Sequence, residues 1–235
     1  MTVKAIFFDL DDTLHDHLQP FSNAFKTVFP AVTQVPMLSL YKKFRDYSDL
    51  LWKDYSQNTL SLEQLREQRI TLALKDFKIW ISNDSAIEFQ LQYEYRLNHL
   101  QLFEEVPTVF KALLEKNYKI GIITNGPVEH QYNKINSLGL TDYILMENVF
   151  VSDDVGIAKP DPKIFNYVAK RFDYLPDEFL YVGDSWHNDV AAPIDAGWRA
   201  IWFNHRKRQP ATSHQPAAII DSLSEIHSVL DKINQ

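Results

Sequence analysis

The sequence predicts an α/β fold in which a doubly wound parallel sheet is interrupted by an inserted α-helical domain. Short apolar runs alternate with helical patterns along most of the chain, which is typical of parallel strands connected by helices. Between residues 21 and 98 the strand signal vanishes, and apolar residues recur at helical spacing. Polar side chains follow several of the apolar runs, and open α/β sheets bind their ligands at that edge. We therefore expect the functional residues to lie at the ends of strands.

Each apolar run that ends in polar residues or glycine is expected to form a buried strand. The runs lie at residues 3–8, 119–123, 148–151, 179–182, 200–203 and 218–220, the last as an edge strand. Helices are expected at residues 107–116, 128–138, 162–172 and 188–196. Pro107 and Pro162 stand where a first helical turn tolerates proline, and Gly139 and Gly197 stand just past helix ends.

The helical stretch after the first expected strand predicts a domain at residues 17–101, while residues 1–16 and 102–235 form the core. Ser61 and Gln64 have the spacing of a capping box, which predicts that a helix starts there. Apolar residues at helical spacing predict two more helices, one with Leu38, Tyr41 and Phe44 and the other with Ile87, Leu91 and Tyr95.

Composition and net charge limit which metals and macromolecules the chain is expected to bind. The 235 residues are 45% hydrophobic and contain no cysteine, so a sizeable core is expected, and thiolate ligands are excluded in favour of a hard cation such as Mg²⁺. The net charge of −7 argues against a nucleic-acid duplex as partner. No apolar run reaches 18 residues and no signal-peptide pattern is present, so we expect no membrane association and a cytoplasmic location. The sequence leaves the oligomeric state open.

Carboxylates gather at the expected ends of two strands. Asp9 and Asp11 follow the first strand, and Asp184 and Asp189 follow the strand at residues 179–182. Two carboxylates about 4 Å apart repel by roughly 4 kcal/mol at the effective dielectric near a protein surface. A site that collects such groups usually also collects a cation or a shared proton. The pattern therefore predicts a cation or a shared proton between these two strand ends.

Complementary groups follow other expected elements. The strand at residues 119–123 ends in Thr124, Asn125 and Gly126, which offer a hydroxyl, an amide and a turn with backbone N–H donors. Lys159 precedes Pro160 near the start of an expected helix. A lone Thr or Lys of this kind is usually structural, so only the combination with the acids indicates a site.

Several other polar residues receive structural interpretations. Asp12, Asp161 and Asp177 are expected to act only as helix N-caps. The basic run at residues 206–208 is expected to be a solvated loop. His15 and His17 could bind a metal, but a pair in a linker is more often a hinge or surface feature.

Four motifs occur in a fixed order: DxDxT at Asp9, a hydrophobic residue with Thr-Asn-Gly at Thr124, Lys-Pro at Lys159, and GDxxxxD at Asp184. This set resembles the motifs of the haloacid dehalogenase superfamily, and specifically of its phosphatases. The resemblance covers nearly the whole chain and is weakest between residues 16 and 98. It implies a Rossmann-like core with a helical cap that closes over the active site and excludes water from a phosphorylated intermediate.

By resemblance, the chain is a Mg²⁺-dependent phosphomonoester hydrolase that acts on a small phosphorylated metabolite through an aspartyl-phosphate. Asp9 would be the nucleophile, and Asp11 would protonate the leaving group and later accept a proton from water, with a pKa raised relative to Asp9. The resemblance implies that Mg²⁺ is held by an oxygen of Asp9, the backbone carbonyl of Asp11 and a carboxylate oxygen of Asp184. Asp189 would orient a metal-bound water or Lys159.

The same resemblance assigns the remaining site residues. Thr124 and the Asn125 and Gly126 amides would hold the phosphoryl oxygens, and Lys159 would offset the charge of the transition state. Thr13 would order the turn after the nucleophile.

Substrate choice stays open among several classes. Asp11-Asp12-Thr13, the Thr124 turn and the stretch from Leu51 to Tyr55 resemble the branch that contains noncanonical pyrimidine 5′-nucleotidases. Trp52 and Tyr55 could stack on a nucleobase, although aromatic residues at helical spacing are more often core.

Other functions also fit part of the sequence. A sugar phosphatase and a phosphosugar mutase of the same superfamily are alternatives, whereas Asp11 argues against a dehalogenase. Response-regulator receivers share the sheet, the acids, a Thr and a Lys, but the helical insert and GDxxxxD speak against a signalling role. A binding protein without turnover is a further alternative.

Overall fold

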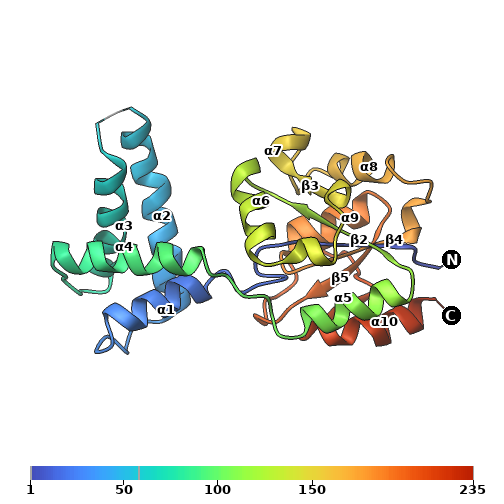
Figure 1. The fold of residues 1–235 in the computed structure, drawn as a ribbon, viewed down its shortest axis with the longest axis horizontal. Coiled ribbons are helices and arrows are strands. Elements are labelled where there is room, and N and C mark those ends of the chain that lie inside the picture. Colours follow the sequence, from blue (N-terminus) through green and yellow to red (C-terminus); the bar gives the residue numbers. More distant parts are fainter. Residues whose placement is uncertain (1, 58, 235) are drawn as a thin grey trace. The chain divides into compact units, whose positions relative to one another are not determined.

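The computed structural model describes residues 2–57 and 59–234, and the chain folds into two compact units (Figure 1). The core unit consists of Met1–Asp16 and Gln101–Gln235, and the helical unit consists of His17–Leu100. The predicted fold class is confirmed, since a helical insertion follows the first strand of a parallel sheet. Among the described residues, no helix combines the length and the apolarity needed to span a bilayer.

The core unit is built on a six-stranded parallel sheet with the order β3-β2-β1-β4-β5-β6. Its strands are β1 (Ala5–Phe8), β2 (Lys119–Thr124), β3 (Val149–Val151), β4 (Phe179–Gly183), β5 (Arg199–Phe203) and β6 (Ala218–Ile220). Each apolar run of the sequence forms one of these strands. Phe8 at the end of β1 pairs with Ile122 on β2 and with Val182 on β4. Because of this register, the residues after β1, β2 and β4 leave the sheet at the same edge.

Helices cover both faces of this sheet, as a doubly wound fold requires. They are α5 (Val106–Glu115), α6 (Val128–Ser137), α7 (Ser152–Val155), α8 (Lys163–Ala169), α9 (Ala192–Asp195) and α10 (Ile226–Ile233). On one face, Phe7 joins a buried cluster with Phe165 of α8 and Ala192 of α9. On the other face, Phe8 packs against Phe110 of α5 with 4.8 Å between ring centroids, and α10 lies beside α5 (Figure 1).

Short helical turns complete the core unit. They are η1 (Leu140–Asp142), η2 (Met146–Asn148), η3 (Pro176–Glu178), η4 (Trp186–Ala191) and η5 (Leu223–Glu225). The helix expected at residues 188–196 differs from this, because its first part is the π-helical turn η4, which runs directly into α9. This wide turn carries Asp189, one of the predicted site residues.

The helical unit contains α1 (Gln19–Val28), α2 (Met37–Ser56), α3 (Leu62–Asp76) and α4 (Asn83–Leu97). The predicted capping box is confirmed at the start of α3. The Ser61 hydroxyl accepts from the Gln64 N–H (3.1 Å), and the Gln64 side chain accepts from the Ser61 N–H (2.9 Å).

The apolar row that predicted α4 is not the buried row of this helix. Leu91 and Tyr95 are each 57% exposed, and the buried row consists of Ala86, Phe89 and Tyr93. The second row carries more aromatic surface, and Phe89 packs edge-on against Phe21 of α1 at a centroid distance of 5.3 Å. Both rows have helical spacing, so spacing by itself did not decide which one faces the neighbouring helices.

Candidate active site

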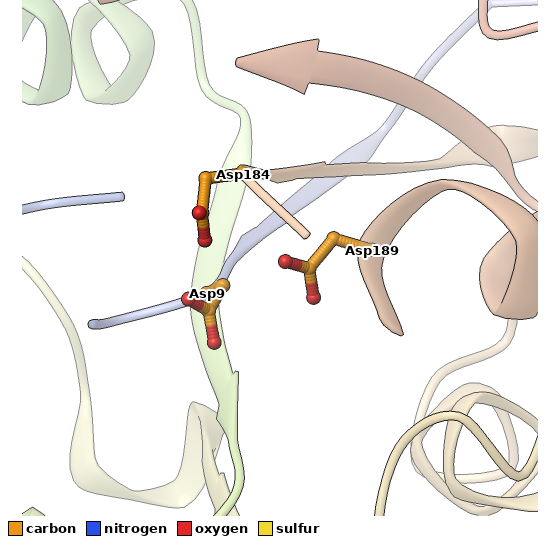
Figure 2. Close-up of side chains that lie close together, drawn as sticks. All are labelled: Asp9, Asp184 and Asp189. Carbon is orange, nitrogen blue, oxygen red and sulfur yellow. The ribbon is translucent and has the colours of Figure 1, made fainter. Parts of the chain in front are cut away.

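Three buried carboxylates meet at the edge of the sheet where β1 and β4 end. Asp9 follows β1, Asp184 follows β4, and Asp189 lies in η4 (Figure 2). Each offers one oxygen atom, and these atoms lie within 4.8 Å of one another. Hard cations such as Mg²⁺ prefer oxygen ligands, and buried like charges need a counter-charge. The donor set therefore fits a divalent cation.

Burial and neighbouring negative charges favour the protonated forms of Asp9 and Asp184. Burial raises the pKa of Asp9 to about 7, although the positive charge of Lys159 opposes this rise. Burial, followed by the charges of Asp189 and Asp9, raises the pKa of Asp184 to about 8. Both carboxyl groups thus hold protons at a pH where unfolded aspartates, with pKa values of about 3.9, are ionised.

Binding of Mg²⁺ is expected to tighten as the pH rises from about 6 to about 8, since the cation must displace protons from Asp9 and Asp184. In chelator, the free energy of unfolding is expected to fall as the pH rises from about 4 to about 8, because the folded state binds more protons than the unfolded state over this range. Calorimetric titration with Mg²⁺ in buffers of different ionisation enthalpy measures the released protons. Affinity independent of pH, without proton release, would contradict this prediction.

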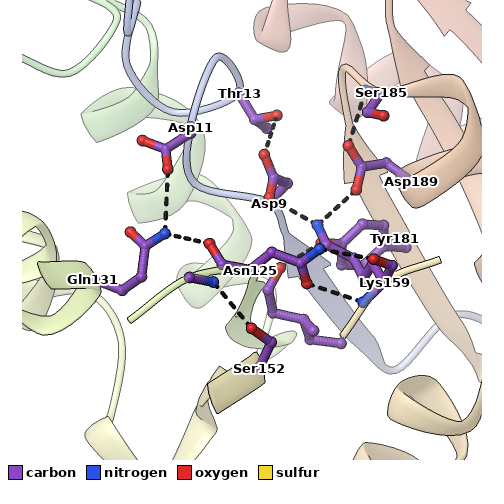
Figure 3. Close-up of polar contacts among 12 residues, drawn as sticks. Asp9, Asp11, Thr13, Asn125, Gln131, Ser152, Lys159, Tyr181, Ser185 and Asp189 are labelled. Atoms are coloured by element: carbon purple, nitrogen blue, oxygen red, sulfur yellow. Dashed lines mark hydrogen bonds and ion pairs between the residues drawn. The ribbon is translucent and has the colours of Figure 1, made fainter. Parts of the chain in front are cut away.

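Lys159 is the counter-ion inside this carboxylate group (Figure 3). Its buried Nζ donates to Asp9 Oδ1 (2.8 Å), to Asp189 Oδ1 (2.7 Å) and to the Tyr181 hydroxyl (2.7 Å). Burial disfavours its charge, but the charges of Asp189 and Asp9 outweigh burial and hold the pKa of Lys159 well above its ordinary value. Lys159 is therefore a permanent cation in contact with Asp9.

The Thr124 turn fixes the backbone of Lys159. The Asn125 amide nitrogen donates to the Lys159 carbonyl (2.8 Å), and the Lys159 N–H donates to the Asn125 side-chain oxygen (2.9 Å). Thr124 is buried at the end of β2, and the Gly126 N–H donates to the Ser152 hydroxyl (3.0 Å). These contacts place the turn at the same sheet edge as Asp9, and its predicted role in phosphate binding stays a prediction.

Asp189 and Thr13 hold the two charged groups in place. The second oxygen of Asp189 accepts from the Ser185 N–H (2.9 Å), so both of its oxygens have partners within the protein. A Cβ atom on Gly183 would lie 2.5 Å from the Asp189 carboxyl group, so glycine is required at the end of β4. The Thr13 hydroxyl donates to Asp9 Oδ2 (3.2 Å). These positions fit the orienting roles predicted for both residues.

The predicted order of the Asp9 and Asp11 pKa values was wrong for this structure. Burial disfavours the charge of Asp11, but a hydrogen bond from His15 and the charge of Lys134 outweigh it and hold the Asp11 pKa below its usual range. His15 Nε2 lies 2.9 Å from Asp11 Oδ1, and Lys134 Nζ lies 2.6 Å from both Asp11 oxygens. His15 is thus a buried partner of Asp11, not a surface residue.

The basic run at residues 206–208, expected to be a solvated loop, instead reaches the acids. Arg208 donates to Asp184 Oδ2 (2.7 Å), and Arg206 pairs with Asp12 and, at 2.8 Å, with Asp16. Asp12 is therefore a buried ion-pair partner and was wrongly expected to be an N-cap. The run follows β5, whose end lies at the same sheet edge, and this position was the available signal.

The N-cap prediction for Asp161 was wrong by one residue, because Pro162 is the N-cap of α8; the Asp161 side chain still accepts from the Lys163 N–H (2.9 Å) at the start of the helix.

Comparison with known proteins decides the family. A family model described as haloacid dehalogenase-like hydrolase matches residues 3–197. The chain belongs to this family. Membership in the haloacid dehalogenase-like hydrolases confirms the resemblance of the four motifs, and the relatives identify the chain as a phosphatase within the family.

Among the relatives of this haloacid dehalogenase-like hydrolase that have named activities are two from different substrate classes. Glyceraldehyde 3-phosphate phosphatase of Pyrococcus furiosus is 30% identical over 209 residues, which cover 87% of this chain and 82% of the relative. Pyrimidine 5′-nucleotidase YjjG of Escherichia coli is 29% identical over 239 residues, which cover 97% of each chain. The crystal structure of HAD-hydrolase YfnB from Bacillus subtilis, bound to magnesium, superimposes with a TM-score of 0.69 at 22% identity, covering 98% of this chain and 100% of YfnB. This last likeness shows the shared fold.

Proposed function

We propose that this phosphatase hydrolyses a small phosphomonoester with Mg²⁺ as cofactor and Asp9 as nucleophile. The observation that carries the proposal is that Asp9 belongs to the buried carboxylate group and also contacts the Lys159 ammonium. A phosphoryl group arriving at Asp9 would meet positive charge beside a nucleophilic oxygen. Phosphoryl transfer depends mainly on such positioning and charge neutralisation.

The chemistry proceeds in two steps. An Asp9 oxygen attacks phosphorus, the bond from phosphorus to the leaving oxygen breaks, and the leaving oxygen takes a proton from the Asp11 carboxyl group. Water then attacks the phosphorus of the aspartyl-phosphate, Asp11 accepts its proton, and Asp9 and inorganic phosphate are released. The carboxylate form favoured by His15 and Lys134 is the form of Asp11 that the second step uses.

The remaining residues bind and orient. Lys159, Thr124 and the backbone amides of Asn125 and Gly126 hold the phosphoryl oxygens, and Asp189 keeps Lys159 directed at Asp9. Asp9, the Asp11 carbonyl and Asp184 would hold Mg²⁺, and the magnesium-bound structure of YfnB supports this choice of metal. When bound, the cation withdraws electron density from the phosphoryl group and offsets the acids.

A nucleoside 5′-monophosphate is the proposed substrate, with a sugar phosphate as the alternative. The YjjG relative, at 29% identity, supports a nucleotide, and the Pyrococcus furiosus relative, at 30% identity, supports a sugar phosphate. The side chain of Trp52, expected to stack on a base or to join the core, lies outside the residues whose side chains the structure describes. A phosphosugar mutase would use the same phosphoaspartate, and turnover to free phosphate separates hydrolase from mutase.

Phosphate release is expected with Mg²⁺ and is expected to fall at least about 100-fold in chelator, with recovery when Mg²⁺ is added back. The assay uses a panel of nucleoside monophosphates, sugar phosphates including glyceraldehyde 3-phosphate, and a generic aryl phosphate. The substrate with the highest kcat/KM identifies the class. Turnover that persists in chelator would contradict metal dependence, and an inert panel would favour a binding or signalling protein.

A further inference from the structure

We propose that Lys134 and Gln131, on one face of α6, are positioning residues that hold the Asp11 carboxyl group in place for proton transfer. The inference rests on the proposed function, in which Asp11 donates a proton to the leaving oxygen and later accepts one from the attacking water. Residues three apart on a helix lie on the same face, so one rigid element presents both side chains. Neither residue belongs to the four motifs.

Lys134 makes the closer contact. Its Nζ lies 2.6 Å from Asp11 Oδ1 and 2.6 Å from Asp11 Oδ2, so one ammonium group fixes both oxygens. The Lys134 side chain is 14% exposed and that of Asp11 is 33% exposed, so the pair is shielded from solvent more than a surface ion pair. With His15 on the other side, Asp11 is held between its own turn and α6.

Gln131 connects Asp11 to the phosphate-binding turn (Figure 3). Its amide nitrogen donates to Asp11 Oδ2 (3.3 Å) and also to the Asn125 carbonyl oxygen. The side chain is 2% exposed, and a Cβ on Gly126 would lie 2.7 Å from the same nitrogen. One side chain thus sets the distance between Asp11 and the Thr124 turn.

The orientation of the Gln131 amide has a single favourable solution. Its Oε1 is buried and has no hydrogen-bond partner among the described residues, which costs free energy. Rotating the amide by half a turn would place Oε1 against the oxygens of Asp11 and Asn125. The two bonds from the nitrogen therefore determine where the side chain points, and a proton donor or acceptor displaced by about 1 Å can lose roughly 100-fold in rate.

The test compares Lys134→Met, Asp11→Asn and the double variant on an alkyl phosphate and an aryl phosphate. Two constants are compared: kcat/KM, which covers the steps up to the phosphoaspartate, and the rate at which the phosphoaspartate is hydrolysed. The hydrolysis step uses Asp11 as the carboxylate whose two oxygens Lys134 contacts, whereas the first step uses its protonated form. We expect Lys134→Met to slow hydrolysis of the phosphoaspartate roughly 100-fold and to lower kcat/KM by less than about 10-fold on either ester. The double variant should be no worse than Asp11→Asn within about 3-fold, because both changes act through one group.

Two further variants guard against a defect of folding. Lys134→Arg keeps a cation that can donate to both Asp11 oxygens and is expected to recover most of the rate of phosphoaspartate hydrolysis. Lys116→Met removes a lysine that also pairs with an aspartate, Asp231 (3.5 Å), on α10, and is expected to leave both constants unchanged.

A loss in kcat/KM as large as the loss in phosphoaspartate hydrolysis, or additive losses in the double variant, would overturn the inference and indicate that Lys134 binds substrate or supports the fold. Failure of the proposed function gives a different result, because Asp9→Asn would then keep full activity on both esters. That result would overturn the proposed function and, with it, the positioning role of Lys134 and Gln131.

Discussion

Asp9→Asn is expected to lower kcat/KM for phosphate release by at least about 10⁴-fold on every substrate that the wild type hydrolyses. Asparagine has nearly the same shape but no nucleophilic carboxylate, so an aspartyl-phosphate cannot form. The loss should not depend on the leaving group, unlike the loss expected for Asp11. Quenched mass spectrometry should show phosphate on the wild-type peptide that contains Asp9 and none on the variant.

The stability of Asp9→Asn separates chemistry from folding. Burial already disfavours the charge of Asp9, so removing that charge is expected to leave the thermal midpoint unchanged or to raise it. Asp231→Asn, which changes an exposed aspartate on α10, is the matched control for both measurements. Full activity in Asp9→Asn would remove Asp9 from the mechanism, whereas an unfolded variant would indicate a structural role.

Lys159→Met is expected to abolish turnover and to lower the free energy of unfolding by about 3–5 kcal/mol in chelator at pH 8. The methionine fills similar space, but Asp9 and Asp189 lose the cation that each of them contacts. Two buried carboxylates without the Lys159 counter-charge then either ionise at a cost in free energy or take up protons. Denaturant unfolding and steady-state kinetics measure the two effects.

The pH dependence identifies the cause of the lost stability. Burial already raises the pKa of Asp9, and the loss of the Lys159 charge raises it further, so the folded variant gains stability as the pH falls and Asp9 takes up a proton. The difference from the wild type is therefore expected to shrink between pH 8 and pH 5. Lys163→Met, which removes an exposed lysine of α8, should show neither effect. A loss of stability independent of pH would point to packing and not to charge.

The residues that the sequence predicted well are those whose position depends on a local signal. Asp9 and Asp184 end apolar runs, and runs that become neighbouring parallel strands bring their last residues together. Lys159 carries only a weak local signal, the proline that follows it, and its role was implied by the family pattern. Its contact with Asp9 spans 150 positions of the chain, which no local rule reaches.

The residues that were missed lie on elements whose facing partners are set by tertiary packing. Lys134 is an ordinary helical lysine until α6 is placed beside the turn after β1, and there, together with a hydrogen bond from His15, it lowers the pKa of Asp11. Arg208 looks like part of a solvated basic run until its loop meets Asp184. In α4, the competing rows of Ile87 and Phe89 show the same limit, because the shape of the opposing helix decides between them.

Tyr181 joins the apolar core to the reacting groups. Its hydroxyl donates to the Ile123 carbonyl (2.6 Å) and accepts from Lys159, while its ring stands edge-on against Phe165 at a centroid distance of 5.0 Å. A change in the size of Phe165 would therefore shift the tyrosine, and with it the ammonium group that faces the nucleophile. Mutations that weaken the interior of this enzyme should be detectable as slower turnover before they are detectable as unfolding.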